Sequence, residues 1–597
     1  MTKTADALLN HIDAEQYPLA PSLIPVVTGP VHWSSAGFPY LDKEEFQNFR
    51  DSLPWLLRGG ASLRATADHI LQVSQSLKLS GQPALELALR VVRTVLNSAA
   101  ITAPSDLWLL RQVLATLLET GITERLIRGD TIRPDDDDHG LDPKELAVDL
   151  SFLMSRGYLI AHDDGMALSA YPQAERVFSQ LSPVPHGPLA QSWASFFQGN
   201  RPSPTLTEAI PSLQPPTLEK FERNHWMASW YDIETGYRLV PLVLGLERAG
   251  WTQDWDTDGS LSEQRRATLA SDAGRAALSI LAAAGIIDSM DTLTLTPTGK
   301  RVLERGAGPF GIIEAYHPYM TQLPAILSRG RGQIHVERAA NVAASQLANS
   351  RSFALANDAL DAFCNETGFS YRVYIEHALG RGEATRQRFE RDGYDRIYVG
   401  ADLEDASIES ARTEQAAERL PATMHFIAGA DIGRARDILD PLADLDIAVD
   451  GAVMVVGNGF HEVRGQTDAR VTDVFREYHD AGILLIFTEE SALSVSDLLE
   501  TAWNTYHAGF KYVHERSGQG LRPARDDPFP GSGPALPASW HRCATRAGYV
   551  CAEPYCRRSR TIFPYRPKSG FNPAISVTHF FVPGPIAKRL DLPLSPR

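Results

Sequence analysis

Glycines and acids between residues 371 and 415 could hold a ligand that carries a ribose. Glu376–Gly382 (EHALGRG) is a glycine-containing turn that follows the β-prone run Arg372–Ile375. Glycine lets a backbone approach a bound group closely, because it has no side chain to collide with that group. Asp402 follows the next apolar run, about twenty residues after the turn, where a carboxylate can accept hydrogen bonds from a ribose diol. The spacing therefore predicts a βαβ unit with a ligand at its turn.

A parallel sheet is the element that would position this turn. Apolar β-prone runs alternate with helical patterns from residue 350 to 597, which predicts a doubly wound α/β sheet with helices on both faces. The expected strands are 372–375, 396–401, 425–432, 451–463, 482–487, 549–563 and 574–582. Ligands bind outside the carboxyl ends of such strands. We therefore expect the polar residues at these ends to meet in one crevice: Glu376–Gly382, Asp402, Asp431, Asn458–Glu462 and Glu489–Glu490.

The order of these strand ends resembles that of class I S-adenosylmethionine-dependent methyltransferases. The first motif of that family is an acid followed by glycines at alternate positions, and this chain has at that spacing Glu376, Ala378, Gly380 and Gly382. Alanine in place of the first glycine should tighten the turn around the methionine part of the cofactor. The resemblance covers residues 350–597. It implies a Rossmann-like, seven-stranded methyltransferase sheet with S-adenosyl-L-methionine as cofactor.

The resemblance also implies cofactor contacts at matching positions. Asp402 matches the ribose-binding acid, and Asp431 in AGADIG matches the polar residue beside the adenine. The expected cofactor-binding residues are Glu376, Ala378, Gly380, Gly382, Asp402, Leu403, Asp431, Ile432 and Asn458. A nicotinamide-dependent dehydrogenase is the alternative, but its G-x-G-x-x-G pattern needs a glycine where this chain has Thr385. The methyltransferase interpretation is therefore favoured.

A histidine and a glutamate further along the chain could remove a proton from a substrate. The resemblance to caffeate-type O-methyltransferases places the general base at His461, in GNGFHEVRG, and the acid that orients it at Glu489. Imidazole titrates near working pH, and a carboxylate on its other ring nitrogen fixes the tautomer. The alternative is that His461 only caps the following loop. Glu462 could contact substrate, act as base or bind a metal, or it could face solvent.

Helical patterns fill the chain before residue 349. We expect a helical, winged-helix-like domain over residues 1–181, a proline-rich linker over 182–216, a second such domain over 217–348 and the cofactor-binding domain over 349–597. Each helical domain contains a helix and a two-stranded ribbon, at 144–170 and 267–306, as a winged helix does. Winged helices often bind DNA, but Lys and Arg are not concentrated in either block. A packing or dimerisation module is therefore favoured.

The segment Tyr316–Tyr319 (YHPY) extends the resemblance beyond the cofactor-binding domain. With the winged-helix pattern it looks like the accessory domain of small-molecule O- and C-methyltransferases, which dimerises and closes over the substrate. The resemblance implies that Tyr316 and Tyr319 contact substrate and that the protein is a homodimer.

Composition excludes several classes of partner. The net charge of −16 argues against a nucleic acid held by a broad basic surface. No apolar run reaches the roughly 18 to 20 residues that span a bilayer, so no membrane partner is expected. Four cysteines are too few for a disulfide scaffold, and a cytoplasmic location is expected. Cys543, Cys551, Cys556 and His541 form a loose cluster without a Cys-x-x-Cys pair, so ordinary thiols are favoured and no metal is expected.

These patterns favour a methyltransferase that moves a methyl group to an oxygen or acidic carbon of a small molecule, in a setting such as secondary metabolism. Two alternatives come from other classes. One is a winged-helix transcription regulator that senses S-adenosylmethionine, which would tolerate loss of His461. The other is a catalytically inert partner subunit with the same fold.

Overall fold

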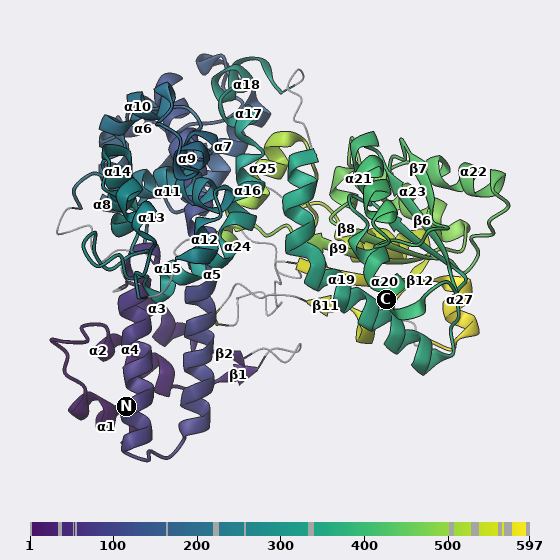
Figure 1. Cartoon of the computed structure of the whole chain (residues 1–597), viewed down its shortest axis with the longest axis horizontal. Helices are drawn as coiled ribbons and strands as arrows, with labels where there is room; N and C mark the ends of the chain where they lie inside the picture. Colours follow the sequence, from purple (N-terminus) through teal and green to yellow (C-terminus); the bar gives the residue numbers. More distant parts are fainter. Residues whose placement is uncertain are drawn as a thin grey trace.

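The computed structural model of the chain has a helical lobe and an α/β lobe, and the long helix α19 (Ala339–Thr367) leads into the second (Figure 1). The residues that it describes are 3–33, 39–51, 53, 56–162, 165–218, 226–255, 258–331, 339–500, 507–526, 536–558, 564–565 and 576–592. Within these ranges, no helix combines the length and apolar character needed to cross a membrane.

The α/β lobe is built on one mixed sheet. Its strands are β5 (Val373–His377), β6 (Ile397–Asp402), β7 (His425–Ala428), β8 (Val453–Gly457), β9 (Leu484–Glu490), β10 (Tyr549–Cys551), β11 (Arg557–Arg558) and β12 (Ser576–Pro583). Seven of them lie in the order β7-β6-β5-β8-β9-β12-β10, and β11 pairs with β12. β5 to β9 are parallel, whereas β12 is antiparallel to both β9 and β10. This order, with the last strand reversed between the fifth and sixth, confirms the predicted seven-stranded methyltransferase fold.

Helices cover both faces of the sheet, because alternate strand residues point to opposite sides. Val373 and Ile375 face one layer, and Tyr374 faces the other. The first layer contains α22 (Arg436–Asp444), α23 (Asp468–Asp480) and α26 (Trp540–Ala547). The second contains α19, α20 (Glu383–Asp392), α21 (Asp405–Ala416) and α27 (Gly584–Arg589). The run 453–456 is buried on both faces, as its unbroken apolar sequence predicts.

The helical lobe has one continuous core. Its helices are α1 (Lys3–His11), α2 (Ala20–Thr28), α3 (Lys43–Asp51), α4 (Leu56–Ser76), α5 (Gln82–Glu119), α6 (Ile122–Ile127), α7 (Pro143–Ser155), α8 (Pro172–Ser179), α9 (Ala190–Phe197), α10 (Pro204–Ala209), α11 (Trp230–Arg248), α12 (Trp251–Asp254), α13 (Glu263–Leu269), α14 (Asp272–Ala283), α15 (Pro297–Arg305), α16 (Ala307–Glu314), α17 (His317–Met320) and α18 (Leu323–Arg329). Gly236 lets α11 approach α5 closely, since a Cβ there would lie 2.4 Å from Leu107 Cβ. The buried cluster runs from Ala5 to Leu327, so the two predicted helical domains share it.

The proline-rich stretch 182–216 is part of this core, and its prediction as a linker is wrong. It contains α9 and α10, and Trp193 of α9 is fully buried against Gly245 of α11. Pro204 stands in the first turn of α10, where a proline needs no N–H, after the N-cap Ser203. The proline content of this stretch therefore does not mark a linker, because two helices of the core lie within it.

The winged-helix pattern is only partly present in the described residues. After α7, the strands β3 (Leu159–His162) and β4 (Gly165–Leu168) form the predicted antiparallel ribbon. At the second location, a single antiparallel bridge joins Ile287 to Leu295 before α15 begins. Thr296 caps α15 by accepting the Gly299 N–H at 2.9 Å, so the chain enters the helix directly after that bridge.

An insertion between β9 and β10 returns to the helical lobe. Its helices are α24 (Val495–Glu500) and α25 (His507–Ser517), which Figure 1 shows among the helices of the first lobe. The ring of Tyr512 in α25 stacks on Phe152 in α7, with centroids 4.7 Å apart. Both helices add buried residues to the helical core, so that core contains segments from two distant parts of the sequence.

A buried ion cluster holds α25 on α7. Arg516 is fully buried and donates to Glu145 Oε2 at 2.5 Å and to Asp149. Tyr512 Oη donates to Asp149 Oδ1 at 2.8 Å. A buried carboxylate is tolerated only with such partners, so the cluster specifies where α25 docks.

Replacing Arg516 with methionine should destabilise this docking. The variant leaves Asp149 buried without a cation, which costs about 3–5 kcal/mol in comparable pairs. We expect the urea midpoint of the helical lobe's unfolding to fall. Arg476→Met, which removes the exposed pair with Asp473, is the control and should change stability by less than about 1 kcal/mol. Equal effects of the two substitutions would contradict the role given to Arg516.

Candidate active site

The loops after the parallel strands meet at their carboxyl ends. A Cβ placed on Gly459, after β8, would lie 3.2 Å from Ala378 Cβ and 3.2 Å from Ile432 Cδ1. The loop after β6 joins them, since Asp402 Oδ2 accepts the N–H of Gly380 at 3.0 Å. The structure therefore brings together the strand ends after β5, β6, β7 and β8.

Glu376, in β5, fixes the position of the glycine turn through hydrogen bonds to the backbone that follows the turn. Its two carboxylate oxygens accept the backbone N–H groups of Ala384 at 3.2 Å and Thr385 at 2.6 Å, in the first turn of α20. Burial raises the pKa of Glu376 to about 7, although these hydrogen bonds oppose the shift. The turn is thus anchored to the helix that follows it by a side chain that is itself 1% exposed.

The glycine turn uses left-handed backbone at three alternate positions. The φ angles are +55° at Ala378, +52° at Gly380 and +81° at Gly382. Glycine adopts this region freely, whereas alanine pays roughly 1–2 kcal/mol. The Ala378 N–H donates to His377 Nδ1 at 2.7 Å, and burial lowers the pKa of His377 to about 4, which keeps that ring neutral and able to accept. The methyl group of Ala378 takes up space between the loop after β5 and the loop after β8, where Gly459 approaches it.

Asp402 lies where a ribose-binding acid would be. It is 7% exposed, and its Oδ1 and Oδ2 accept the N–H groups of Glu404 at 2.9 Å and Gly380 at 3.0 Å. Burial raises its pKa, although the two hydrogen bonds oppose the shift. Leu403 follows it and is half-buried.

The next two strand ends present a mixture of polar and apolar groups. Asp431 Oδ1 accepts the Gly433 N–H at 2.8 Å, and the neighbouring Ile432 is buried. Asn458, after β8, has a left-handed φ of +55° and donates its N–H to Thr488 O at 2.8 Å. That bond fixes the β8 loop to the end of β9.

His461 and Glu489 form a buried pair. His461 lies in a short 3-10 helix, η4 (Phe460–Glu462), and its Nδ1 is 2.9 Å from Glu489 Oε2. The other oxygen of Glu489 accepts the N–H of Phe460 at 2.6 Å and of His461 at 3.2 Å. The side chain of Glu489 therefore fixes both the imidazole and the backbone that carries it. The structure brings this predicted pair together in hydrogen-bonding contact.

A chain of hydrogen bonds links the second ring nitrogen of His461 to the helical lobe. Glu462 Oε1 lies 3.5 Å from His461 Nε2 and accepts Gln519 Nε2 at 2.5 Å. Gln519 Oε1 accepts the Tyr316 hydroxyl at 2.9 Å. Tyr319 is buried next to Tyr316, with ring centroids 6.4 Å apart. Glu462, a predicted substrate contact, thus lies beside His461, and Tyr316, another, is connected to it through Gln519.

Two residues near this histidine were missed from the sequence. Gln519 bridges Glu462 and Tyr316, and the ring of His514 meets that of His461 edge-on at 4.9 Å between centroids. Both belong to the insertion between β9 and β10, which strand-end reasoning does not reach. The Gly-Gln-Gly run at 518–520 was the available sequence signal, because glycines often mark a close approach of the backbone to another group. The structure shows such an approach, since a Cβ on Gly520 would lie 2.5 Å from Gln466 Oε1.

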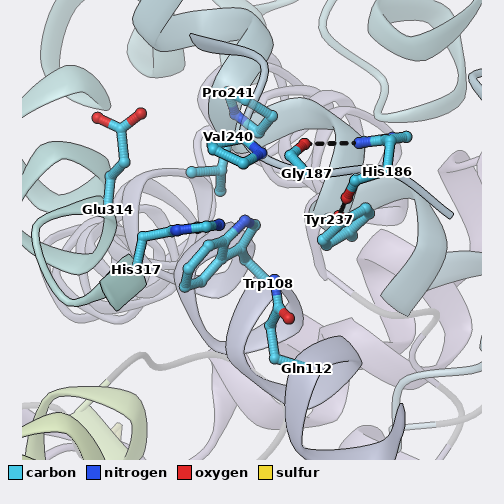
Figure 2. A pocket seen from close by; sticks show the side chains of 10 residues that line it. Trp108, Gln112, His186, Gly187, Tyr237, Val240, Pro241, Glu314 and His317 are labelled. Carbon is cyan, nitrogen blue, oxygen red and sulfur yellow. Dashed lines mark hydrogen bonds between the residues drawn. The ribbon is translucent and has the colours of Figure 1, made fainter. Parts of the chain in front are cut away.

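A small pocket lies within the helical lobe (Figure 2). It is lined by Trp108, Gln112, His186, Gly187, Pro188, Tyr237, Val240, Pro241, Glu314 and His317. Figure 2 shows His317 lying beside the indole of Trp108, and their ring centroids are 5.8 Å apart. Burial lowers the pKa of His317, which favours a neutral ring in this apolar setting.

The charge of His461 is set by its two acidic neighbours. Burial opposes a charged ring, but the carboxylates of Glu489 and Glu462 outweigh it and raise the pKa of His461 to about 10. The free protein therefore carries an imidazolium between two carboxylates at neutral pH. Its conjugate base is stronger than an ordinary histidine, so the group can deprotonate weaker acids.

Glu489→Gln should lower the pKa of His461 from about 10 toward the ordinary value of 6.5, and a nuclear magnetic resonance titration of the ring would show it. Because the folded ring holds its proton more tightly than the unfolded one, its stabilisation is complete below pH 6.5 and is lost as the pH rises to about 10. The variant should flatten that decline in the free energy of unfolding. Glu477→Gln, on the exposed side of α23, is the control. If the His461 ring of the wild-type protein titrates near 6.5, the two carboxylates do not raise its pKa and this assignment is wrong.

Comparisons with known proteins found similar chains among solved structures alone. No protein-family model and no curated protein matches the chain. Among solved structures, the CurJ carbon methyltransferase is 12% identical, covering 66% of this chain and 91% of its own, with a TM-score of 0.30. An O-methyltransferase family protein from Burkholderia thailandensis is 17% identical, covering 55% and 91%, with a TM-score of 0.33. NcsB1, an O-methyltransferase from neocarzinostatin biosynthesis solved with S-adenosylmethionine and 2-hydroxy-5-methyl naphthoic acid, is 14% identical, covering 54% and 88%, with a TM-score of 0.31.

Proposed function

We propose that the chain, whose α/β lobe has the class I methyltransferase fold, is an S-adenosylmethionine-dependent methyltransferase that acts on a small molecule. The observation that carries this proposal is the buried His461–Glu489 pair, held at the strand ends where the loops after the neighbouring strands converge. Methyl transfer needs an acceptor atom in line with the methyl group, about 3 Å away. It also needs a base where the acceptor has a proton to lose, and this pair supplies one.

The strand-end loops suit the cofactor in their chemistry. The carboxylate of Asp402 accepts two backbone N–H groups and interacts with the Ser407 side chain, which leaves at least one of its four lone pairs for a ribose hydroxyl. The turn with Gly380 and Gly382 would take the methionine part, and the cofactor would supply a methyl group on a positively charged sulfur. We propose the same residues as before for the remaining cofactor contacts: Glu376, Ala378, Leu403, Asp431, Ile432 and Asn458.

The basicity of His461 favours an acceptor that is weakly acidic. A pKa of about 10 for the imidazolium matches that of a phenol, which is about 10. Proton transfer from a phenolic hydroxyl or an enolisable carbon would then be nearly balanced, as general-base catalysis requires. We therefore propose a phenolic oxygen or an acidic carbon as methyl acceptor, of the kind common in secondary metabolites.

The helical lobe would close the substrate side of the site. Tyr316 reaches His461 through Gln519 and Glu462, so a substrate at the imidazole would meet groups from both lobes. Tyr319 is proposed as a further contact because it lies beside Tyr316. Homodimer formation through the helical lobe stays a prediction.

Asp402→Ala should weaken binding of S-adenosylmethionine by about 1–3 kcal/mol, the size of losing charged hydrogen bonds to a ribose. Isothermal titration calorimetry of the purified wild-type and variant proteins with S-adenosylmethionine and S-adenosylhomocysteine measures this change in binding free energy. Asp405→Ala, on the exposed first turn of α21, is a matched control that should bind normally. If the wild-type protein binds neither compound, the proposed function is wrong.

His461→Ala should keep cofactor affinity and lose turnover by about 10²–10⁴-fold, because only the proton transfer is removed. The assay follows S-adenosylhomocysteine release with a panel of phenols and keto acids. His425→Ala, at the start of β7 and away from the strand ends, is the control. A regulator or inert subunit would instead bind cofactor without turnover in the wild type.

The kcat/KM of the wild-type protein should rise as the pH increases from neutral toward about 10, because only the deprotonated imidazole of His461 acts as base. Glu462→Gln removes one of the two charges that raise the pKa of His461, so it should move this rise to lower pH. A kcat/KM profile that is unchanged by the substitution would place the titrating group elsewhere.

A further inference from the structure

Sulfur, nitrogen and oxygen donors gather at the β10 edge of the sheet, outside the site described above. The Sγ atoms of Cys551 and Cys556 are 3.7 Å apart, and Cys551 Sγ lies 3.5 Å from Glu553 Oε1. Donor atoms of His541, Cys551 and Glu553 all lie within 4.8 Å of one another. The cluster draws on three elements: α26, β10 and the 3-10 helix η5 (Glu553–Tyr555).

These separations are those of a tetrahedral zinc site. With Zn–S near 2.3 Å and Zn–O near 2.0 Å, tetrahedral angles place two sulfurs about 3.8 Å apart and a sulfur and an oxygen about 3.5 Å apart. The observed 3.7 Å and 3.5 Å match both values. The mixture of thiolate, imidazole and carboxylate is also a ligand set that zinc accepts.

Local structure brings these residues together despite their spacing in sequence. Cys551 ends β10, and the Cys556 N–H donates to Glu553 O at 3.1 Å, so η5 folds the second cysteine back toward the first. Ser539 caps α26 by accepting the Arg542 N–H at 3.0 Å, which places His541 in the first turn of that helix. A four-residue separation closed by a 3-10 turn thus takes the place of a Cys-x-x-Cys pair.

The imidazole of His541 lacks a partner for one nitrogen. Its Nε2 is buried and makes no hydrogen bond with any residue that the structure describes. Buried polar atoms are almost always satisfied by a hydrogen bond or an ion, so such an atom needs an explanation, and a bound metal ion would supply one. One nitrogen of the same ring lies within 4.8 Å of the donor atoms of Cys551 and Glu553, so the imidazole can reach a metal ion held there.

A positive side chain near the cluster offsets the excess negative charge of the ligands. Two thiolates and one carboxylate carry three negative charges, which leaves a net charge of about −1 around Zn²⁺. Arg525 lies at the same edge and supplies a compensating cation, since its Nη2 lies 3.8 Å from Cys551 Sγ.

We propose that His541, Cys551, Glu553 and Cys556 bind one structural zinc ion. Four protein ligands leave no open position, which is the arrangement of a structural rather than a catalytic zinc. The ion would tie α26 to the edge strand β10 and to η5. This site does not depend on the proposed methyltransferase activity.

The test measures metal in the full-length protein, purified under reducing conditions and without chelator. Elemental mass spectrometry should find about one zinc per chain, as expected for a single structural site. Cys551→Ser combined with Cys556→Ser should lose that zinc. Cys364→Ser, which alters a half-buried cysteine of α19 outside the cluster, should retain it.

A second measurement uses only the wild-type protein, so it tests the proposal even if the double cysteine variant does not fold. Wild-type protein stripped by a chelator and reloaded with Co²⁺ should show thiolate-to-cobalt charge-transfer absorption, and its thermal midpoint should rise with added Zn²⁺. Stripped protein that takes up neither metal would overturn the proposal. So would a disulfide between Cys551 and Cys556 in peptides mapped from the freshly purified protein.

Discussion

Buried carboxylates that accept backbone N–H groups hold the strand-end loops of the α/β lobe in place. Glu376 binds the first turn of α20, Asp402 binds the glycine turn, and Glu489 binds the segment that carries His461. A carboxylate is expensive to bury, and paired backbone donors are among the few groups that offset the cost. Each loop is therefore fixed by a strand residue that belongs to the rigid sheet, and the geometry of the site follows from the sheet.

The same constraint explains how far the sequence could predict the site. Acids at strand ends are visible as a pattern because each ends an apolar run, and the structure brings His461 and Glu489 into contact as expected. What the pattern does not reveal is that these acids also serve the backbone. The raised pKa of His461 was beyond the sequence too, since it depends on Glu462 being held by Gln519, a residue of the inserted segment.

The fold was predictable where periodicity and strand order are local properties. The strands of the sheet and its class were identified from alternating apolar runs, and the structure confirms the class. The helical lobe was harder, because composition is a poor guide to burial. A high proline content made residues 182–216 look like a linker, although Trp193 is fully buried there. Contacts between segments far apart in sequence, such as Phe152 with Tyr512, leave no local signal at all.

The insertion between β9 and β10 has a consequence for how the chain is made. Synthesis proceeds from the N-terminus, and domains generally fold as units while it does so. The helical lobe cannot complete its core in that order, because α25 is translated only after most of the sheet. Until then, Asp149 and Phe152 of α7 present an unfilled surface to the ribosome and its chaperones. The lobe that starts first is thus among the last to finish, and its completion links the maturation of both halves of the protein.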